Sequence, residues 1–347
     1  MLSKELILEV LSKKEGHAYA PFRVYVPTSA PSGNCYVRYN MEYQYSDVRD
    51  NYKPCSTTNV SNYRIREAHL VRVDAVEETS VRGEELCKVL QQGEISLAIR
   101  EDLEDTAHLA QGAHPIEKNG ECFSADFIGG YHGDERLTAV SLTADGTAVD
   151  LTADAPQALS CKALDFTQTT RLYRWGTSSA ESYGTPVAEH TQHMRFRCDG
   201  VRNKQALVWL CDDFHARKNA TFLQMFTMKR VQNGAPVCEN VETFGEGGET
   251  LGRVCVPLQP EKDHVALPHP AARSVKYSSA ESDISAEVGF RILNDSLRTD
   301  NTWIQVRTSQ GDNKWYASFS SPQNGHVPQR GERWELELFA HIDYAGQ

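Results

Sequence analysis

The stretch HTQHMRFRCDGVRNKQALVWL, residues 190–210, decides the fold class. Apolar and polar residues alternate along its first half. The apolar register holds Met194, Phe196 and Cys198, and the polar register holds His193, Arg195 and Arg197. A period of two is typical of a strand with one buried face. Asp199-Gly200 supplies a turn, so the stretch predicts a β-hairpin whose basic side chains lie on the ligand-accessible face.

The same signals recur on both sides of this hairpin. RLTAVSLTADGTAVDL (136–151) alternates and turns at Asp145-Gly146. The final segment contains four strand-like runs separated by turn residues: EVGFRILND (287–295), NTWIQVRTS (301–309), NKWYASFSS (313–321) and RWELELFAHIDYA (333–345). We therefore expect an all-β fold, an antiparallel β-sandwich or jelly roll, over residues 21–347, with a possible subdivision near residues 257–275.

The first residues carry a different pattern. Leu6, Ile7, Val10 and Leu11 fall at helical spacing, with Lys and Glu between them, and Gly16 follows. This pattern predicts a short N-terminal helix within residues 1–20. The apolar run is too short for a signal peptide, so we expect a cytoplasmic protein, or a secreted one from which a signal has been removed. We expect no membrane span.

Charge and cysteine content narrow the function classes. The net charge is -11, and no Lys/Arg-rich run is present, so we expect no nucleic-acid partner. An acidic substrate would require positive charge concentrated locally at its site. The nine cysteines form no CxxC pair, which favours reduced thiols in a reducing compartment over structural zinc.

A second polar cluster lies in FIGGYHGDERL, residues 127–137. Tyr131, His132, Asp134 and Glu135 follow a pair of glycines, and a glycine bend lets a ligand approach the backbone closely. Together with the basic strand at 190–197, this cluster suits β-elimination of a uronic-acid-containing polysaccharide or oligosaccharide.

The reaction assigns a role to each group. It needs a base, for which we expect His132 or His190, and an acid for the leaving oxygen, for which we expect Tyr131. A cation must neutralise the sugar carboxylate, and Arg195 or Arg197 fits that role. His190 shares the register of Met194, and we expect it to reach the site from the start of its strand. The remaining candidates for substrate binding are His193, Arg197, Asp134, Glu135 and Trp175.

The Tyr-His cluster in FIGGYHGDE, the Arg-bearing strand HTQHMRFR and the closing strand NKWYASFSS resemble features of jelly-roll polysaccharide lyases. The resemblance implies a carbohydrate-active enzyme, but it matches no full family motif. The acidic net charge and the absence of a signal peptide depart from a typical secreted lyase.

Two alternatives stay open. GGYHGDE also resembles the GGxHGxE motif of zinc carboxypeptidases and deacylases, which implies a divalent metal on His132 and Glu135 with His190, His193 or His215 as a third ligand. The residues after Glu135 read as a strand where those families have a helix. The chain could instead be a non-catalytic carbohydrate-binding or phage-tail-like structural protein. The oligomeric state is left open.

Overall fold

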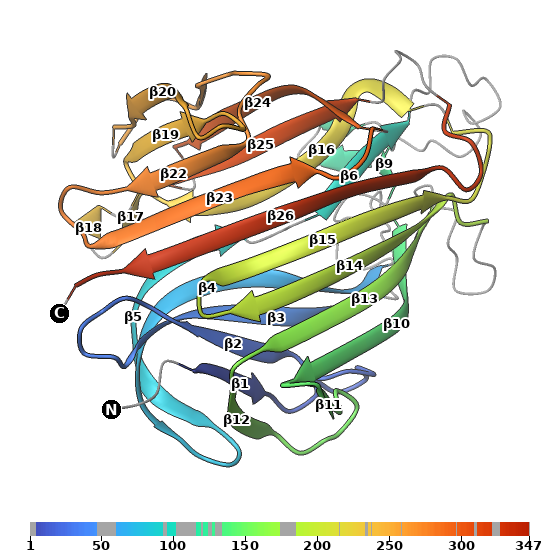
Figure 1. Ribbon diagram of the computed structural model, residues 1–347. Coiled ribbons are helices and arrows are strands. Elements are labelled where there is room, and N and C mark those ends of the chain that lie inside the picture. Colours follow the sequence, from blue (N-terminus) through green and yellow to red (C-terminus); the bar gives the residue numbers. More distant parts are fainter. Residues whose placement is uncertain are drawn as a thin grey trace.

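A computed structural model gives the arrangement of most of the chain. It describes residues 5–46, 60–92, 96–101, 116–118, 121–123, 127–128, 134–173, 185–214, 216–232, 235–236, 238–257, 259–295, 297–308, 311–320 and 327–346. All regular elements among these residues are β-strands, arranged in two large layers (Figure 1). The expected all-β class is confirmed, and the described strand pairings are antiparallel except for one short parallel pairing.

One layer, called the back sheet here, contains the first strands of the chain. In spatial order its strands are β12 (Gln157–Cys161), β1 (Leu6–Val10), β2 (Phe22–Pro27), β3 (Cys35–Ser46), β4 (Val60–Val76), β5 (Val81–Gln92), β16 (Ala216–Lys229), β25 (Asp312–Ser320), β24 (Arg298–Arg307) and β21 (His264–Ala266). Two further strands extend it beside β16, namely β6 (Ser96–Glu101) and β9 (Phe127–Ile128).

The other layer, the front sheet, crosses Figure 1 from green to red. In spatial order its strands are β11 (Thr147–Val149), β10 (Asp134–Ala144), β13 (Leu164–Tyr173), β14 (Ala188–Arg197), β15 (Gly200–Trp209), β26 (Arg333–Tyr344), β23 (Ile284–Ile292), β22 (Ser274–Ser278), β19 (Asn240–Phe244) and β20 (Thr250–Cys255). A short parallel pairing of β10 with β4 joins the two sheets. Two small hairpins complete the described strands: β7 (Ile116–Lys118) with β8 (Glu121–Phe123), and β17 (Val231–Gln232) with β18 (Ala235–Pro236).

Aromatic rings from both sheets meet in the core between the layers. The ring of Phe22 on β2 lies 5.4 Å from that of Phe166 on β13, and the ring of Phe290 on β23 lies 5.1 Å from that of Phe319 on β25. All four rings are buried. Burial of each such side chain contributes about 1.5–3 kcal/mol. The inward-facing residues therefore hold the two layers of strands together.

The chain turns as expected at its two Asp-Gly dipeptides. Asp145 and Gly146 both have positive φ, at 48° and 80°, as the tight two-residue hairpin turn between β10 and β11 requires. The second hairpin joins β14 to β15 next to Gly200, whose φ is 120°. A Cβ at Gly200 would lie 2.3 Å from the carbonyl oxygen of Ala340, so the close approach of β26 requires glycine here.

The expected N-terminal helix is wrong for the described residues, because Leu6–Val10 forms β1 between β12 and β2. Leu6, Leu8 and Val10 face the core between the sheets, while Ile7 packs into a smaller cluster on the opposite face of the back sheet. A strand covered on both faces is a continuous apolar run, and periodicity cannot separate such a run from a helical turn.

Two further expectations concern the whole chain. No described segment forms a helix with the length and hydropathy that crossing a membrane requires. The division of the chain near residues 257–275 stays a prediction.

Candidate functional site

Strand β14 separates two chemically different surfaces. His190, Gln192, Met194 and Phe196 point inward and are buried, whereas the side chains between them are partly exposed on the outer face of the front sheet. Those outward residues include His193, Arg195 and Arg197, as the period-two pattern predicts. Cys198 does not continue the inner register, because β14 ends at Arg197 and Cys198 is exposed in the turn.

Glu135 lies in a buried polar layer on the inner face. Its carboxylate accepts hydrogen bonds from Thr170 Oγ1 at 2.6 Å and from Asn62 Nδ2 at 2.9 Å. Asn62 belongs to β4 and Glu135 to β10, so the carboxylate connects the two sheets. A buried carboxylate needs such donors, because an unpaired charge in the core costs several kcal/mol. These contacts give Glu135 a clear structural role.

His190 belongs to the same polar layer. Its Nε2 lies 3.1 Å from Oε1 of Gln205 on β15. Burial lowers the pKa of the His190 imidazole below its ordinary value, while the negative charge of Glu135 acts in the opposite direction. Burial dominates, so the imidazole is neutral at pH 7. Two of the expected site residues, His190 and Glu135, are thus both buried in the core and interact electrostatically.

The other expected site residues fall into two groups. Tyr131, His132 and Trp175 lie outside the described residues, and Asp134 begins β10. His190 and Arg195 are both described, but they project from opposite faces of β14. The front sheet therefore separates the expected base from the expected carboxylate partner, and a single site formed from these two side chains is not present.

The zinc alternative depended on Glu135 and His132. Both carboxylate oxygens of Glu135 already accept hydrogen bonds. Among the residues that the structure describes, no cluster of three His, Cys, Asp or Glu side chains is arranged to hold a metal ion. His132 and His215 lie outside those residues.

The outer face of the front sheet carries a cluster centred on Glu337 of β26. Its carboxylate lies 3.1 Å from Arg291 on β23, 3.3 Å from Arg195 on β14 and 3.7 Å from Arg202 on β15. The Glu337 side chain is only 9% exposed, whereas that of Arg291 is 66% exposed. The carboxylate thus holds the arginines in place while leaving guanidinium surface open to solvent.

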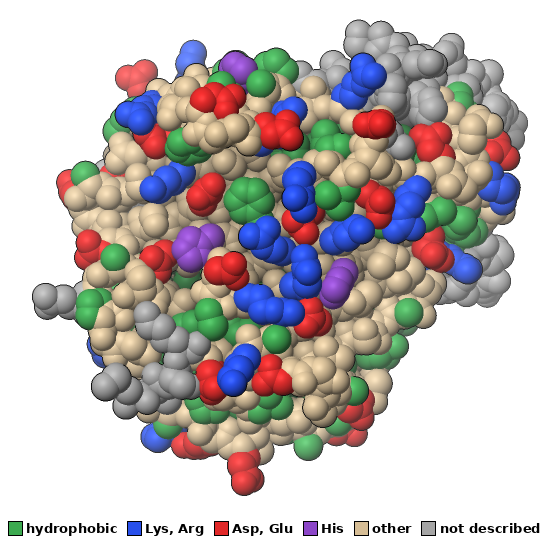
Figure 2. Space-filling view, viewed as in Figure 1, with side chains coloured by type: hydrophobic (Ala, Val, Ile, Leu, Met, Phe, Trp, Pro, Cys, Tyr) green, Lys and Arg blue, Asp and Glu red, His purple; other side chains and the backbone are tan. Residues whose placement is uncertain are grey.

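More charged residues extend this cluster, which we call the arginine face. Its cations are Arg195, Arg197, Arg202, Lys204, Arg291 and Arg333, and its anions are Asp165, Glu335 and Glu337. Figure 2 shows Lys and Arg side chains gathered over the middle of this side of the molecule. Six cations against three anions concentrate positive charge here, although the chain as a whole carries -11. A local field of this kind attracts anionic ligands.

An aromatic ring borders the arginine face. Phe339 of β26 lies directly opposite Gly289 of β23, and a Cβ at Gly289 would lie 2.2 Å from Cζ of the phenyl ring. The ring therefore lies across the glycine, and it remains partly exposed. A hollow of about 690 Å³ begins beside it, lined in part by Arg273, Arg291 and Glu287. A flat ring beside guanidinium groups can stack on a sugar while the arginines bind its carboxylate.

Sequence reasoning missed the central members of this site. Glu337 and Phe339 alternate with apolar residues in RWELELF, and Arg202 follows the turn at Gly200, so each could be assigned to an outward register. What brings them together is that β26 lies between β15 and β23. That strand order pairs β15 with a strand that begins more than 120 residues later, and no local sequence pattern predicts this pairing.

No protein-family model matches this chain, and no curated protein sequence does. Among solved structures, the chain is similar to the GH36 alpha-galactosidase AgaA from Geobacillus stearothermophilus, with 10% identity, a TM-score of 0.35, and coverage of 81% of this chain and 40% of that one. A putative aldose 1-epimerase from Escherichia coli K12 also has 10% identity and a TM-score of 0.35, over 80% of this chain and 96% of that one. Scores this low establish neither a shared fold nor a shared function.

Proposed function

We propose that this protein binds a uronic-acid-containing oligosaccharide or polysaccharide on the arginine face. One observation supports the proposal above the others: three arginines converge on the buried carboxylate of Glu337 next to the flat ring of Phe339. Guanidinium groups form charge-assisted, often bidentate hydrogen bonds with carboxylates. A phenyl ring covers the apolar face of a sugar. The combination matches a sugar ring that bears a carboxylate.

The internal carboxylates make such a site selective. Glu337, Glu335 and Asp165 neutralise part of the positive charge and fix the directions of the guanidinium groups. A ligand must then place its own anionic groups at the guanidinium and ammonium donors that these carboxylates leave unused. This arrangement favours regularly spaced single carboxylates over a densely charged polyanion.

Cleavage of the glycan by β-elimination is the finer form of this proposal. Such a reaction needs a base next to the bound uronic acid. On this face the described imidazole closest to the arginines of β14 is that of His193, whose Nε2 lies 3.5 Å from the Asp165 carboxylate. His193 would replace His190 in the role of base, because His190 faces the core. The buried polar residues around Glu135 then stabilise the fold and take no part in the reaction.

The test is a titration calorimetry series with oligogalacturonate as the probe. We expect the double variant Arg202→Ala/Arg291→Ala to bind at least about tenfold more weakly than the wild type, since each lost charge-assisted contact is worth about 1.5–3 kcal/mol before solvent screening. Arg82→Ala is the matched control, because Arg82 is an exposed arginine of β5 that is also ion-paired, with Glu77 at 2.7 Å.

Three results would contradict the proposal: equal binding by the double variant, equal binding of neutral dextran, or tighter binding of duplex DNA than of oligogalacturonate. The same mixtures are followed by near-ultraviolet absorbance. A rise that is lost in His193→Ala but kept in His190→Gln would support β-elimination on this face. Unchanged absorbance together with intact binding would mean that the protein binds the glycan but does not cleave it.

A further inference from the structure

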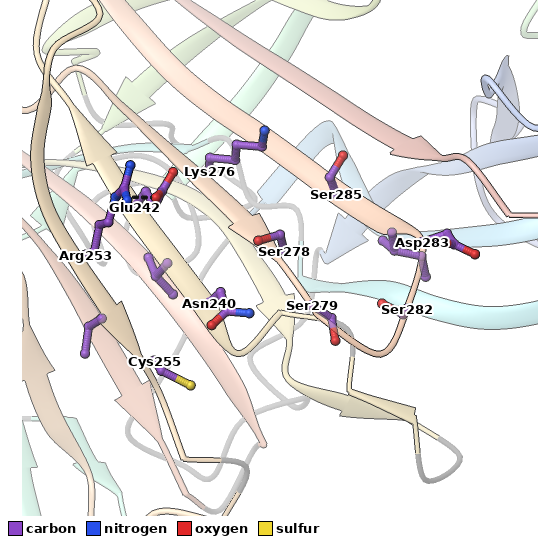
Figure 3. Close-up of a pocket in the computed structure, with 13 residues that line it drawn as sticks. Asn240, Glu242, Arg253, Cys255, Lys276, Ser278, Ser279, Ser282, Asp283 and Ser285 are labelled. Atoms are coloured by element: carbon purple, nitrogen blue, oxygen red, sulfur yellow. Dashed lines mark ion pairs between the residues drawn. The ribbon is translucent and has the colours of Figure 1, made fainter.

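A second hollow opens on the outer face of the front sheet, beside the first one. It has a volume of about 580 Å³ and lies over β20, β19, β22 and the start of β23. Figure 3 shows its side chains, with the Glu242–Arg253 ion pair on one side and a serine-rich turn on the other. Its polar lining differs from the arginine face, because hydroxyl and amide groups outnumber charges.

Strand register places the two hollows end to end. Lys276 of β22 lines the second hollow and lies directly opposite Glu287 of β23, which lines the first. Along β23 the outward positions run from Ser285 through Glu287 and Gly289 to Arg291. These six residue steps span about 20 Å, since each strand residue advances about 3.4 Å. The two hollows therefore lie along one line on one face.

The second hollow offers neutral hydrogen-bonding groups. Asn240, Ser278 and Ser285 are neighbours across β19, β22 and β23, and all three line the hollow. Hydroxyl and amide groups of this kind match the hydroxyl groups of a sugar ring, which both donate and accept.

We infer that the two hollows form one extended groove for a linear acidic oligosaccharide, whose chain runs along β23 from Arg291 to Ser285. This inference rests on the proposed function and adds the length and direction of the ligand. A carboxylate-bearing sugar occupies the region of Arg291 and Phe339, and the following sugars place their hydroxyl groups in the serine-lined hollow. A disaccharide is too short to occupy both ends, so a longer oligosaccharide gains contacts that a disaccharide does not make.

The experiment compares a digalacturonate and a hexagalacturonate by titration calorimetry on the full chain. We expect the hexamer to bind the wild type at least about tenfold more tightly than the dimer, as one or two added hydrogen-bonded contacts would give. In Asn240→Ala/Ser285→Ala this gain should shrink at least about fivefold, while dimer binding stays within about twofold of the wild type. The matched control is Ser141→Ala, an exposed serine of β10 at the far side of the same sheet.

The variants separate failure of the groove from failure of the site. If the hexamer keeps its full advantage in the double variant, the advantage arises from repeated binding frames along the ligand, and the groove is wrong while the arginine face stands. Equal wild-type affinities for the two ligands overturn the groove in the same way. If neither ligand binds, or if Arg202→Ala/Arg291→Ala leaves dimer binding unchanged, the proposed function itself fails and the groove fails with it.

Discussion

The two faces of β14 carry similar polar residues in opposite environments. On the inner face, His190 is buried, hydrogen-bonded to Gln205 and close to the carboxylate of Glu135. On the outer face, His193 is partly exposed beside Asp165, next to a field of arginines. The inner residues connect two sheets through hydrogen bonds to other buried groups, whereas the outer ones keep surface for a ligand. Residue type alone therefore does not distinguish structural from functional histidines on this strand.

The largest contrast is expected from neighbouring truncations on the two faces. Phe196→Ala removes a fully buried ring and should lower the free energy of unfolding by about 3–5 kcal/mol. Arg195→Ala, one residue away on the outer face, should change it by no more than about 1 kcal/mol, because Arg195 is 43% exposed and Glu337 keeps Arg202 and Arg291 as partners. Urea unfolding of the two variants measures both values. Similar losses of unfolding free energy would show that the two faces of β14 do not differ in their contribution to stability.

A smaller contrast uses adjacent threonines. Thr170→Val deletes a donor to the buried Glu135 carboxylate and should cost about 1.5–3 kcal/mol of unfolding free energy. Thr169→Val on the outer face removes only a contact of 3.2 Å to the Thr191 hydroxyl and should cost less than about 1 kcal/mol. The two substitutions are identical in chemistry, so equal costs in urea unfolding would argue against a tightly bonded polar layer.

The inner face should also respond to pH. An unfolded histidine has a pKa of about 6.5, and burial lowers the pKa of His190 in the folded protein. Below about pH 6.5 the unfolded chain therefore binds a proton that the folded chain does not. The free energy of unfolding then decreases as the pH is lowered, by at most about 1.4 kcal/mol per pH unit. His190→Gln should lose less stability than the wild type between about pH 7.5 and about pH 5.5. Equal losses in urea titrations at these two pH values would show that His190 is not the group responsible.

The smallest expected effect on ligand binding tests the role of Phe339 on the outer face. Gly289→Ala places a methyl group where the Phe339 ring now lies and should push the ring off the sheet. Binding of hexagalacturonate should weaken by about threefold to tenfold, within the range expected for one stacking contact. The unfolding free energy should fall by about 1–3 kcal/mol, because the Phe339 ring can move away but the Ser274 Cβ, 2.8 Å from the added methyl group, is held by the backbone. Unchanged binding in calorimetry would remove Phe339 from the site.

Local patterns predicted the parts of this molecule that depend on neighbouring residues in the chain. The hairpin at Gly200, the turn at Asp145-Gly146 and the outward register of His193 follow from a period of two and from glycine turns. The strand Leu6–Val10 was misread as a helix because burial on both faces removes that period. The alternation along β14 correctly placed His190 and Arg195 on opposite faces, but the expectation that His190 reaches the site from the start of the strand is not met, because His190 is buried in the core. The convergence of Arg195, Arg202 and Arg291 on Glu337 depends on strand order, which no local pattern contains.

The central place of β26 has a consequence for biosynthesis. Without β26, the front sheet consists of two unconnected halves, ending at β15 and at β23. A ribosome adds residues at about 5–20 per second, so roughly 6–25 s pass between the synthesis of Trp209, where β15 ends, and Arg333, where β26 begins. During that time the edge of β15 has no partner, and an unpaired edge invites pairing with other chains. The arginine face takes Glu337 and Phe339 from β26, so it is assembled only when this late strand closes the sheet.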